Sequence, residues 1–317
     1  MNGHIKNILF PTDFSEVANN ALQVAIAMAQ RQEATLHLLH VIVPQYLSIV
    51  GDTAFTLNSE DWFDVEVKSR ENLEKMSEEI RKEYNIKINP IATMGYVMES
   101  IERYTENLNT DIIVMGTHGN SGVREFFIGS NAYSTIKNAT CPVLTIPINC
   151  SKTAFENVLF PVRNIDGAED KYNSVTQILK ANHSKVELLG VANFNDFSAF
   201  DRITETVASL KLKMKNDKVE VVHNNEFCEN IADFILEYAN TSNSDLLVIN
   251  AKIDNDWKRF FIGTFAQKII NHAKCPVLSI KPKVSKYEFE NTFKMKVMEA
   301  KNQINNQLIF PHISVLS

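Results

Sequence analysis

The chain has 317 residues, 44% of them apolar, and a formal net charge of −6. This length suits two domains of ordinary size with apolar cores. The pI near 5.8 argues against a nucleic-acid-binding protein, which usually has a basic surface. No apolar run of 18 residues occurs and none follows Met1, so we expect a cytoplasmic protein without membrane contact.

The first half of the chain alternates between short apolar runs and segments with helical periodicity. The apolar runs predict strands at residues 5–10, 35–43, 86–92, 111–115 and 142–148. Helical spacing predicts helices at residues 15–31, 61–84, 97–104 and 130–138. This alternation is typical of a parallel sheet covered by helices on both faces, with right-handed crossovers.

The second half repeats the first. The segment from Asp111 to Leu144 matches the segment from Asp245 to Leu278 at a constant offset of 134 residues, whereas the openings of the halves match at an offset of 150. The second copy is therefore 16 residues shorter between these segments, and we expect the extra length of the first copy near residues 44–60. The strands of the second copy are expected near Val158, Val186, Val219, Leu246 and Val277.

A short linker at residues 149–155 joins the copies, and a tail at residues 283–317 follows them. Within the tail, residues 287–303 have the pattern of an amphipathic helix and residues 308–316 are apolar. We expect the tail to pack on a domain or on a partner.

The main candidate for function in the first copy is a glycine pattern, Gly116-x2-Gly119-x9-Gly129-Ser130. It starts at the end of the predicted fourth strand and finishes at a helix N-terminus, where free N–H groups and the helix dipole attract an anion. Glycines let the backbone approach phosphates closely. Two alternatives stand beside this interpretation: the glycines make turns, and the Ser130 hydroxyl caps the helix.

The second copy weakens the turn alternative. Its counterparts of Gly116 and Gly119 are Asn250 and Ile253, so the fold tolerates side chains at both positions. The glycine pattern has neither Walker A nor GxGxxG spacing, which excludes the common nucleotide motifs.

Asp13 is the second candidate for function. It follows the first predicted strand, at the sheet edge where ligands bind in open α/β folds, and its carboxylate can accept hydrogen bonds from a ribose or a base amine. The alternative is support of the next helix. Its counterpart is Arg163, which reverses the charge and has no acceptor.

Together these motifs resemble the universal stress protein family in its tandem form. The matching features are the glycine pattern, the Phe-Pro-Thr-Asp opening, His40-Val41, Gly95-x-Val97 and the Cys-Pro-Val-Leu that ends each copy. The resemblance implies two Rossmann-like α/β domains with five parallel strands in order 3-2-1-4-5. We expect a domain with an intact nucleotide loop at residues 1–149 and a degenerate one at residues 156–282.

The resemblance also implies a ligand and its site. The ligand would be ATP with Mg²⁺, with Asp13 at the adenosine and the Val41 backbone at the adenine edge, while the glycine loop holds ribose and phosphates. The expected binding residues are Thr12, Asp13, Val41, Met115, Gly116, Gly119, Gly129, Ser130 and Asn131. Family members without the glycine motif generally do not bind ATP, and the second copy looks like one of those.

The resemblance further implies that the fifth strands, near residues 141–147 and 275–281, pair within one chain. Of the four cysteines, Cys141 and Cys275 occupy equivalent positions, and we interpret these two as buried small apolar side chains. A homodimer and an unidentified protein partner are further expectations.

No nucleophile–base pair and no zinc-type cluster is recognisable in the sequence, so neither a catalytic nor a metal-ligating residue is predicted. We therefore expect a nucleotide-dependent sensor or switch. The alternatives are a slow ATPase and a nucleotide-independent interaction protein.

Overall fold

The computed structural model describes residues 4–43, 49–50, 53–54, 59–117, 128–251, 253–254 and 261–281. The chain divides into two compact units, residues 1–282 and 283–317, and all the described residues lie in the first. The helix expected at residues 287–303 and the apolar segment 308–316 lie outside the described residues.

Each half alternates strands and helices as the sequence predicts. The first half contains β1 (Asn7–Pro11), α1 (Glu16–Gln32), β2 (Thr35–Ile42), β3 (Ile49–Val50), β4 (Thr53–Ala54), α2 (Ser59–Tyr84), β5 (Lys87–Met94), α3 (Val97–Asn107), β6 (Ile112–Gly116), α4 (Ser130–Asn138) and β7 (Val143–Ile146). The second half contains β8 (Asn157–Val162), α5 (Ala168–Ala181), β9 (Lys185–Asn193), α6 (Phe197–Asn216), β10 (Glu220–Cys228), α7 (Ile231–Thr241), β11 (Leu246–Asn250), β12 (Ile253–Asp254), β13 (Phe261–Ile262), α8 (Thr264–His272) and β14 (Val277–Ile280).

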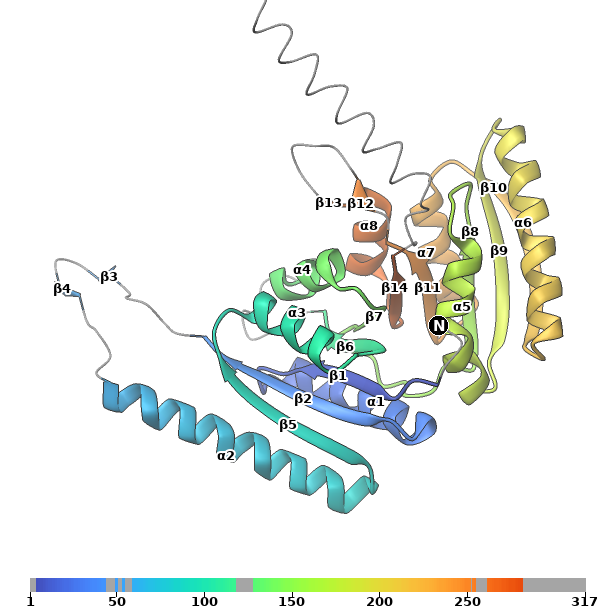
Figure 1. Cartoon of the computed structure of the whole chain (residues 1–317). Coiled ribbons are helices and arrows are strands. Elements are labelled where there is room, and N and C mark those ends of the chain that lie inside the picture. The colour runs from blue at the N-terminus through green and yellow to red at the C-terminus, as the bar shows by residue number, and fades with distance from the viewer. Residues whose placement is uncertain are drawn as a thin grey trace, which may run out of the picture. The chain divides into compact units, whose positions relative to one another are not determined.

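The main strands of both halves form one ten-stranded sheet in the order β10-β9-β8-β11-β14-β7-β6-β1-β2-β5 (Figure 1). Each half therefore has the predicted strand order 3-2-1-4-5, and the pairs within each half are parallel. The two halves meet where β7 pairs antiparallel with β14, with Leu144 opposite Leu278. The predicted pairing of the fifth strands is confirmed.

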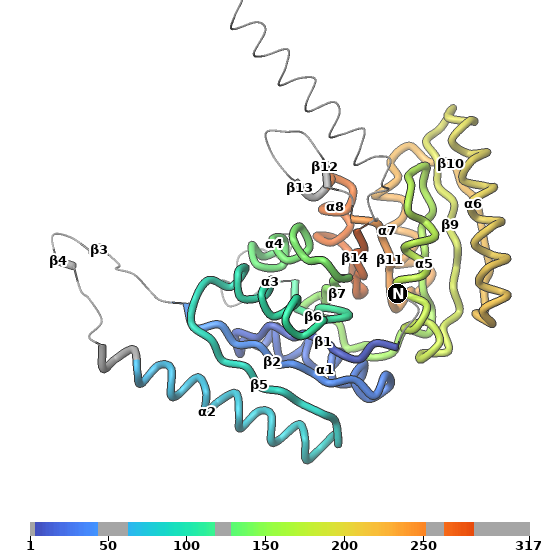
Figure 2. The backbone as a smooth tube through the Cα atoms, in the orientation of Figure 1, coloured from blue at the N-terminus to red at the C-terminus, as the bar shows by residue number. Residues whose placement is uncertain are grey.

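Helices cover both faces of this sheet, as expected. The helices α1, α2, α5 and α6 pack on one face, and α3, α4, α7 and α8 pack on the other (Figures 1 and 2). Each face has its own core, and each core runs through both halves. Alternate strand residues supply the two cores: Ile8 and Phe10 of β1 point to the first, and Leu9 points to the second.

The start and the end of α1 follow from local chemistry. The Ser15 Oγ accepts a hydrogen bond from the Ala18 N–H at 3.2 Å, which is the predicted N-cap. The helix ends at Glu33, whose φ of 53° lies in the left-handed region.

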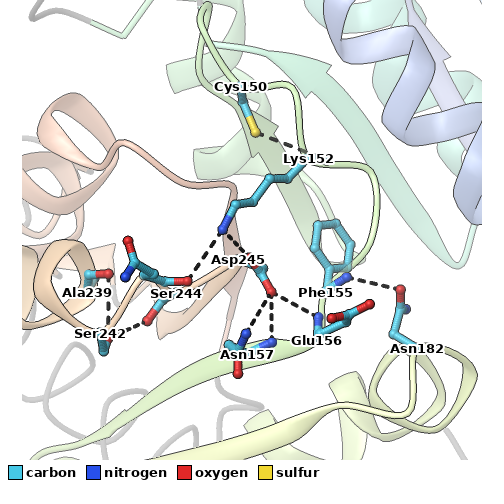
Figure 3. Close-up of polar contacts among 11 residues, drawn as sticks. Cys150, Lys152, Phe155, Glu156, Asn157, Asn182, Ala239, Ser242, Ser244 and Asp245 are labelled. Atoms are coloured by element: carbon cyan, nitrogen blue, oxygen red, sulfur yellow. Dashed lines mark hydrogen bonds and ion pairs between the residues drawn. The ribbon is translucent and has the colours of Figure 1, made fainter.

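A repeated carboxylate ties the first strand of each half to the start of its fourth strand. The Asp111 Oδ2 accepts the backbone N–H groups of Lys6 and Asn7, at 2.7 and 3.0 Å. Its counterpart Asp245 accepts those of Glu156 and Asn157, at 3.1 and 2.8 Å (Figure 3).

The linker adds a further contact to Asp245. The Lys152 ammonium forms an ion pair with Asp245, so the linker is anchored to the second half directly before β8 (Figure 3).

The extra length of the first half lies where the sequence predicts it. Residues 43–58 connect β2 to α2, whereas only residues 194–196 connect β9 to α6. Among the described helices, none is long and apolar enough to cross a membrane.

Candidate functional site

A cavity of about 300 Å³ lies at the carboxyl ends of β1 and β6 in the first half. In the sheet, β1 lies between β2 on one side and β6 on the other, so the strand order changes direction at β1. Such a switch point is where ligands bind in open α/β sheets. The cavity volume lies within the range of small-molecule pockets, roughly 300–1,000 Å³.

The structure brings the predicted binding residues together around this cavity. Eight of them line it: Thr12, Asp13, Val41, Met115, Gly116, Gly129, Ser130 and Asn131. The ninth, Gly119, lies outside the described residues. Contact of these residues with a nucleotide remains a prediction.

The N-terminus of α4 forms one wall of the cavity. Gly129 is the N-cap and has no side chain to offer, so the first-turn N–H groups lack the capping bond that Ser15 gives α1. Ser130 is the first helical residue rather than the cap, which does not support the capping alternative. The Gly129 N–H is held by the Thr117 carbonyl at 2.7 Å, which closes the glycine loop at its base. An anion is the natural partner for such a helix end.

The segment after β1 places Asp13 at the opposite wall. The Asp13 Oδ1 accepts the Ser15 N–H at 3.0 Å, and the Thr12 Oγ1 accepts the Phe14 N–H at 3.1 Å. Asp13 thus also supports the start of α1, as the alternative interpretation expects. A carboxylate can accept roughly four hydrogen bonds, so support of α1 and contact with a ligand hydroxyl do not exclude each other.

Backbone groups of β2 extend beyond the end of β1. The Leu39 carbonyl accepts the Thr12 N–H at 2.8 Å, and the pairing of β1 with β2 ends at Pro11–Leu39. Successive residues of a parallel strand direct their backbone groups to alternate sides, so those of Val41 point to the same side as those of Leu39. They lie on the side of β2 that faces β1, and Val41 lines the cavity.

Apolar side chains form the rest of the cavity wall, and sequence analysis did not single out most of them. Leu39, Ile101 and Ala18 line it together with Val97 and Met115. Ile101 could have been identified from the sequence, because it lies four residues after Val97 and therefore on the same face of α3. An apolar wall suits the face of a flat ring.

The equivalent place in the second half is filled by side chains. Its residual cavity measures only about 10 Å³. The Arg163 guanidinium, the counterpart of Asp13, lies over the Phe265 ring at 3.5 Å from its centre. The amide of Asn250, the counterpart of Gly116, donates to the Asp166 carbonyl at 3.2 Å.

Two basic side chains, the half-buried Arg163 and the buried Lys171, complete this filling. Burial lowers the pKa of Arg163 to about 10. Burial, and then the charge of Arg163, lower the pKa of Lys171 well below its usual value, while its ammonium donates to the Pro161 carbonyl. Sequence analysis did not identify Lys171 and Phe265, although the repeat offsets of 150 and 134 make them the counterparts of Ala21 and Asn131.

No group of three or more His, Cys, Asp or Glu side chains that could hold a metal ion occurs within the described ranges. A cation at the cavity would also draw on oxygen atoms from a ligand or from water.

Known proteins resemble this chain over both halves. The model of the universal stress protein family matches residues 4–147 and again residues 155–281. Universal stress protein MJ0577 of Methanocaldococcus jannaschii is 33% identical over 152 residues, which cover 44% of this chain and 94% of that protein. Universal stress protein MJ0531 of the same organism is 32% identical over 142 residues, 44% of this chain and 81% of that protein.

A solved structure extends the likeness to nearly the whole described chain. The crystal structure of a universal stress protein from Archaeoglobus fulgidus covers 87% of this chain and 98% of its own, with a TM-score of 0.68 and 19% identity. At this identity the likeness shows the fold. The two family matches, with the strand order found in each half, decide the classification: this chain belongs to the universal stress protein family and carries two tandem domains of it.

Proposed function

We propose that the first half binds one molecule of ATP and acts as a nucleotide-dependent sensor or switch, while the second half binds none. The observation that supports this proposal is the contrast between the two halves. The cavity of the first measures about 300 Å³ and that of the second about 10 Å³ at the equivalent place.

The chemistry of the cavity walls fits a nucleotide triphosphate. The N–H groups at the start of α4 and the positive end of its dipole would bind phosphate oxygens. Asp13 would accept hydrogen bonds from the adenosine part, and the Val41 backbone would pair with the adenine edge. Mg²⁺ would be held by phosphate oxygens and water, which it prefers to a cage of protein ligands.

We propose binding rather than turnover, because the sequence shows no recognisable nucleophile–base pair at the glycine loop. A switch of this kind changes its partner contacts with nucleotide occupancy. The homodimer and the partner protein stay predictions. We also propose a cytoplasmic location, where ATP is abundant and thiols stay reduced, since all four cysteines are free.

Titration calorimetry with ATP tests the proposal. We expect one site per chain in protein freed of bound nucleotide by denaturation and refolding. Protein purified without that step should release adenine nucleotide on denaturation, which chromatography detects. Two equivalent sites per chain, or no binding at all, would refute the proposal.

A glycine substitution separates the site from the fold. Gly119→Val places a branched side chain in the predicted phosphate loop, so ATP binding should be lost. The second copy carries Ile253 at this position, so the fold should tolerate the change, which circular dichroism checks. Unchanged affinity in a folded variant would place the phosphates elsewhere.

A further inference from the structure

A hydrogen bond crosses from the second half to the glycine loop of the first. The Ile128 N–H donates to the Asn271 Oδ1 at 2.8 Å, across 143 residues of sequence. Ile128 directly precedes Gly129, the N-cap of α4, and Asn271 lies in the last turn of α8. The end of the loop is thus held from two sides, because the next N–H, that of Gly129, is bound by the Thr117 carbonyl.

The surroundings of this bond make it a firm support. The Ile128 side chain packs against the core that α4 and α8 share, and β13 of the second half packs against α4. A half-buried backbone N–H needs a partner, so loss of the Asn271 oxygen would leave the Ile128 amide to find another. Movement of Ile128 would move Gly129 and the N–H groups that follow it.

This support works in one direction only. The counterpart of Asn271 in the first half is Lys137. An ammonium only donates hydrogen bonds, so Lys137 cannot accept a backbone N–H from the loop of the second half. The acceptor therefore lies in the half without the glycine pattern, and the N–H group that it binds lies in the half with the pattern.

We propose that Asn271 is a positioning residue of the nucleotide site: it fixes the end of the glycine loop so that the α4 N–H groups are aligned for the phosphates. This inference rests on the proposed function. It assigns the second half a role in binding by the first, and linkage requires the reverse effect as well. Bound ATP should tighten the contact between Ile128 and α8.

The variant Asn271→Ala tests the proposal, since alanine favours the helix and removes the side-chain amide that supplies the acceptor. We expect ATP affinity to fall roughly two- to tenfold, the worth of one hydrogen bond. Adenosine affinity should fall less than ATP affinity, because adenosine has a ribose but no phosphate to contact the α4 N–H groups. The matched control is Asn240→Ala, the same substitution at an exposed position of α7.

Hydrogen exchange of the Ile128 amide gives a second readout that a general loss of stability would not mimic. It should be faster in Asn271→Ala, remain slow in Asn271→Asp, which keeps an oxygen acceptor, and be slowed further by ATP in the parent protein.

Three outcomes would overturn the proposal. They are ATP affinity equal to that of the parent, equal losses for ATP and adenosine, and unchanged exchange of the Ile128 amide in Asn271→Ala. In each case ATP still binds the parent protein, so the proposed function survives. A parent protein that binds neither ATP nor adenosine would instead refute the proposed function, and this inference with it.

Discussion

The filled pocket of the second half shows how to close the pocket of the first. The double variant Asp13→Arg/Asn131→Phe introduces the residues that the second half carries at these positions, Arg163 and Phe265. Both side chains to be replaced are exposed, so the fold should accept the change. The stacked pair would occupy a cavity of about 300 Å³ as it does in the second half, where about 10 Å³ remains.

Two losses set the size of the effect. Removing the Asp13 carboxylate deletes a charge-assisted hydrogen bond worth about 1.5–3 kcal/mol, and the new side chains exclude the ligand from the space that remains. We therefore expect ATP affinity to fall more than about 100-fold, which corresponds to about 2.7 kcal/mol.

Denaturation with and without ATP measures this loss. At a concentration of 100 times the dissociation constant, ATP should stabilise the parent by about 2.7 kcal/mol and the double variant by almost nothing. The control is Glu205→Arg, the same kind of charge reversal at an exposed position of α6. If the double variant folds and keeps one ATP per chain at the parent affinity, the nucleotide does not bind in this cavity.

Two further predictions concern stability. Among the described residues, the buried Ser279 Oγ has no hydrogen-bond partner, whereas the Thr145 Oγ1 donates to the Val277 carbonyl at 3.2 Å. Ser279→Ala should therefore raise the free energy of unfolding by about 1 kcal/mol and Thr145→Val should lower it by about as much, as urea denaturation would show; equal effects would contradict this account. Because the fold lowers the pKa of Lys171, the unfolded chain binds one more proton than the folded chain at pH values between the folded pKa and 10.5. Parent stability should rise with pH through that window, so any advantage of Lys171→Met over the parent should shrink as pH approaches 10.5; a constant difference would show that Lys171 is charged in the fold.

The fold was predictable because its determinants are local and repeated. Apolar runs and helical spacing identified the strands and helices, and the resemblance supplied their order. The predicted cavity residues met for the same reason: Asp13 follows β1 and Gly116 ends β6, and β1 and β6 are neighbours in the sheet. Strand ends that share one edge bring short motifs together without any detailed packing argument.

The remaining features depend on contacts between distant residues. Phe265 has the pattern of an ordinary helix residue, and only the structure shows the Arg163 guanidinium over its ring. Lys171 looks like one more charge on α5 until its burial is known. Asn271 has no local signal at all, because its partner Ile128 lies 143 residues away in the other half.

Together, these contacts suggest why a degenerate second half can persist. Its β14 pairs with β7, so the first half does not end in an exposed sheet edge at β7. Its pocket is filled by its own side chains, with the Arg163 guanidinium over the Phe265 ring. In the proposed function, such a half is a support for the end of the glycine loop of the first half. The hydrogen bond from Ile128 to Asn271 joins the two halves, so a second half that binds no nucleotide would still contribute to the proposed binding by the first.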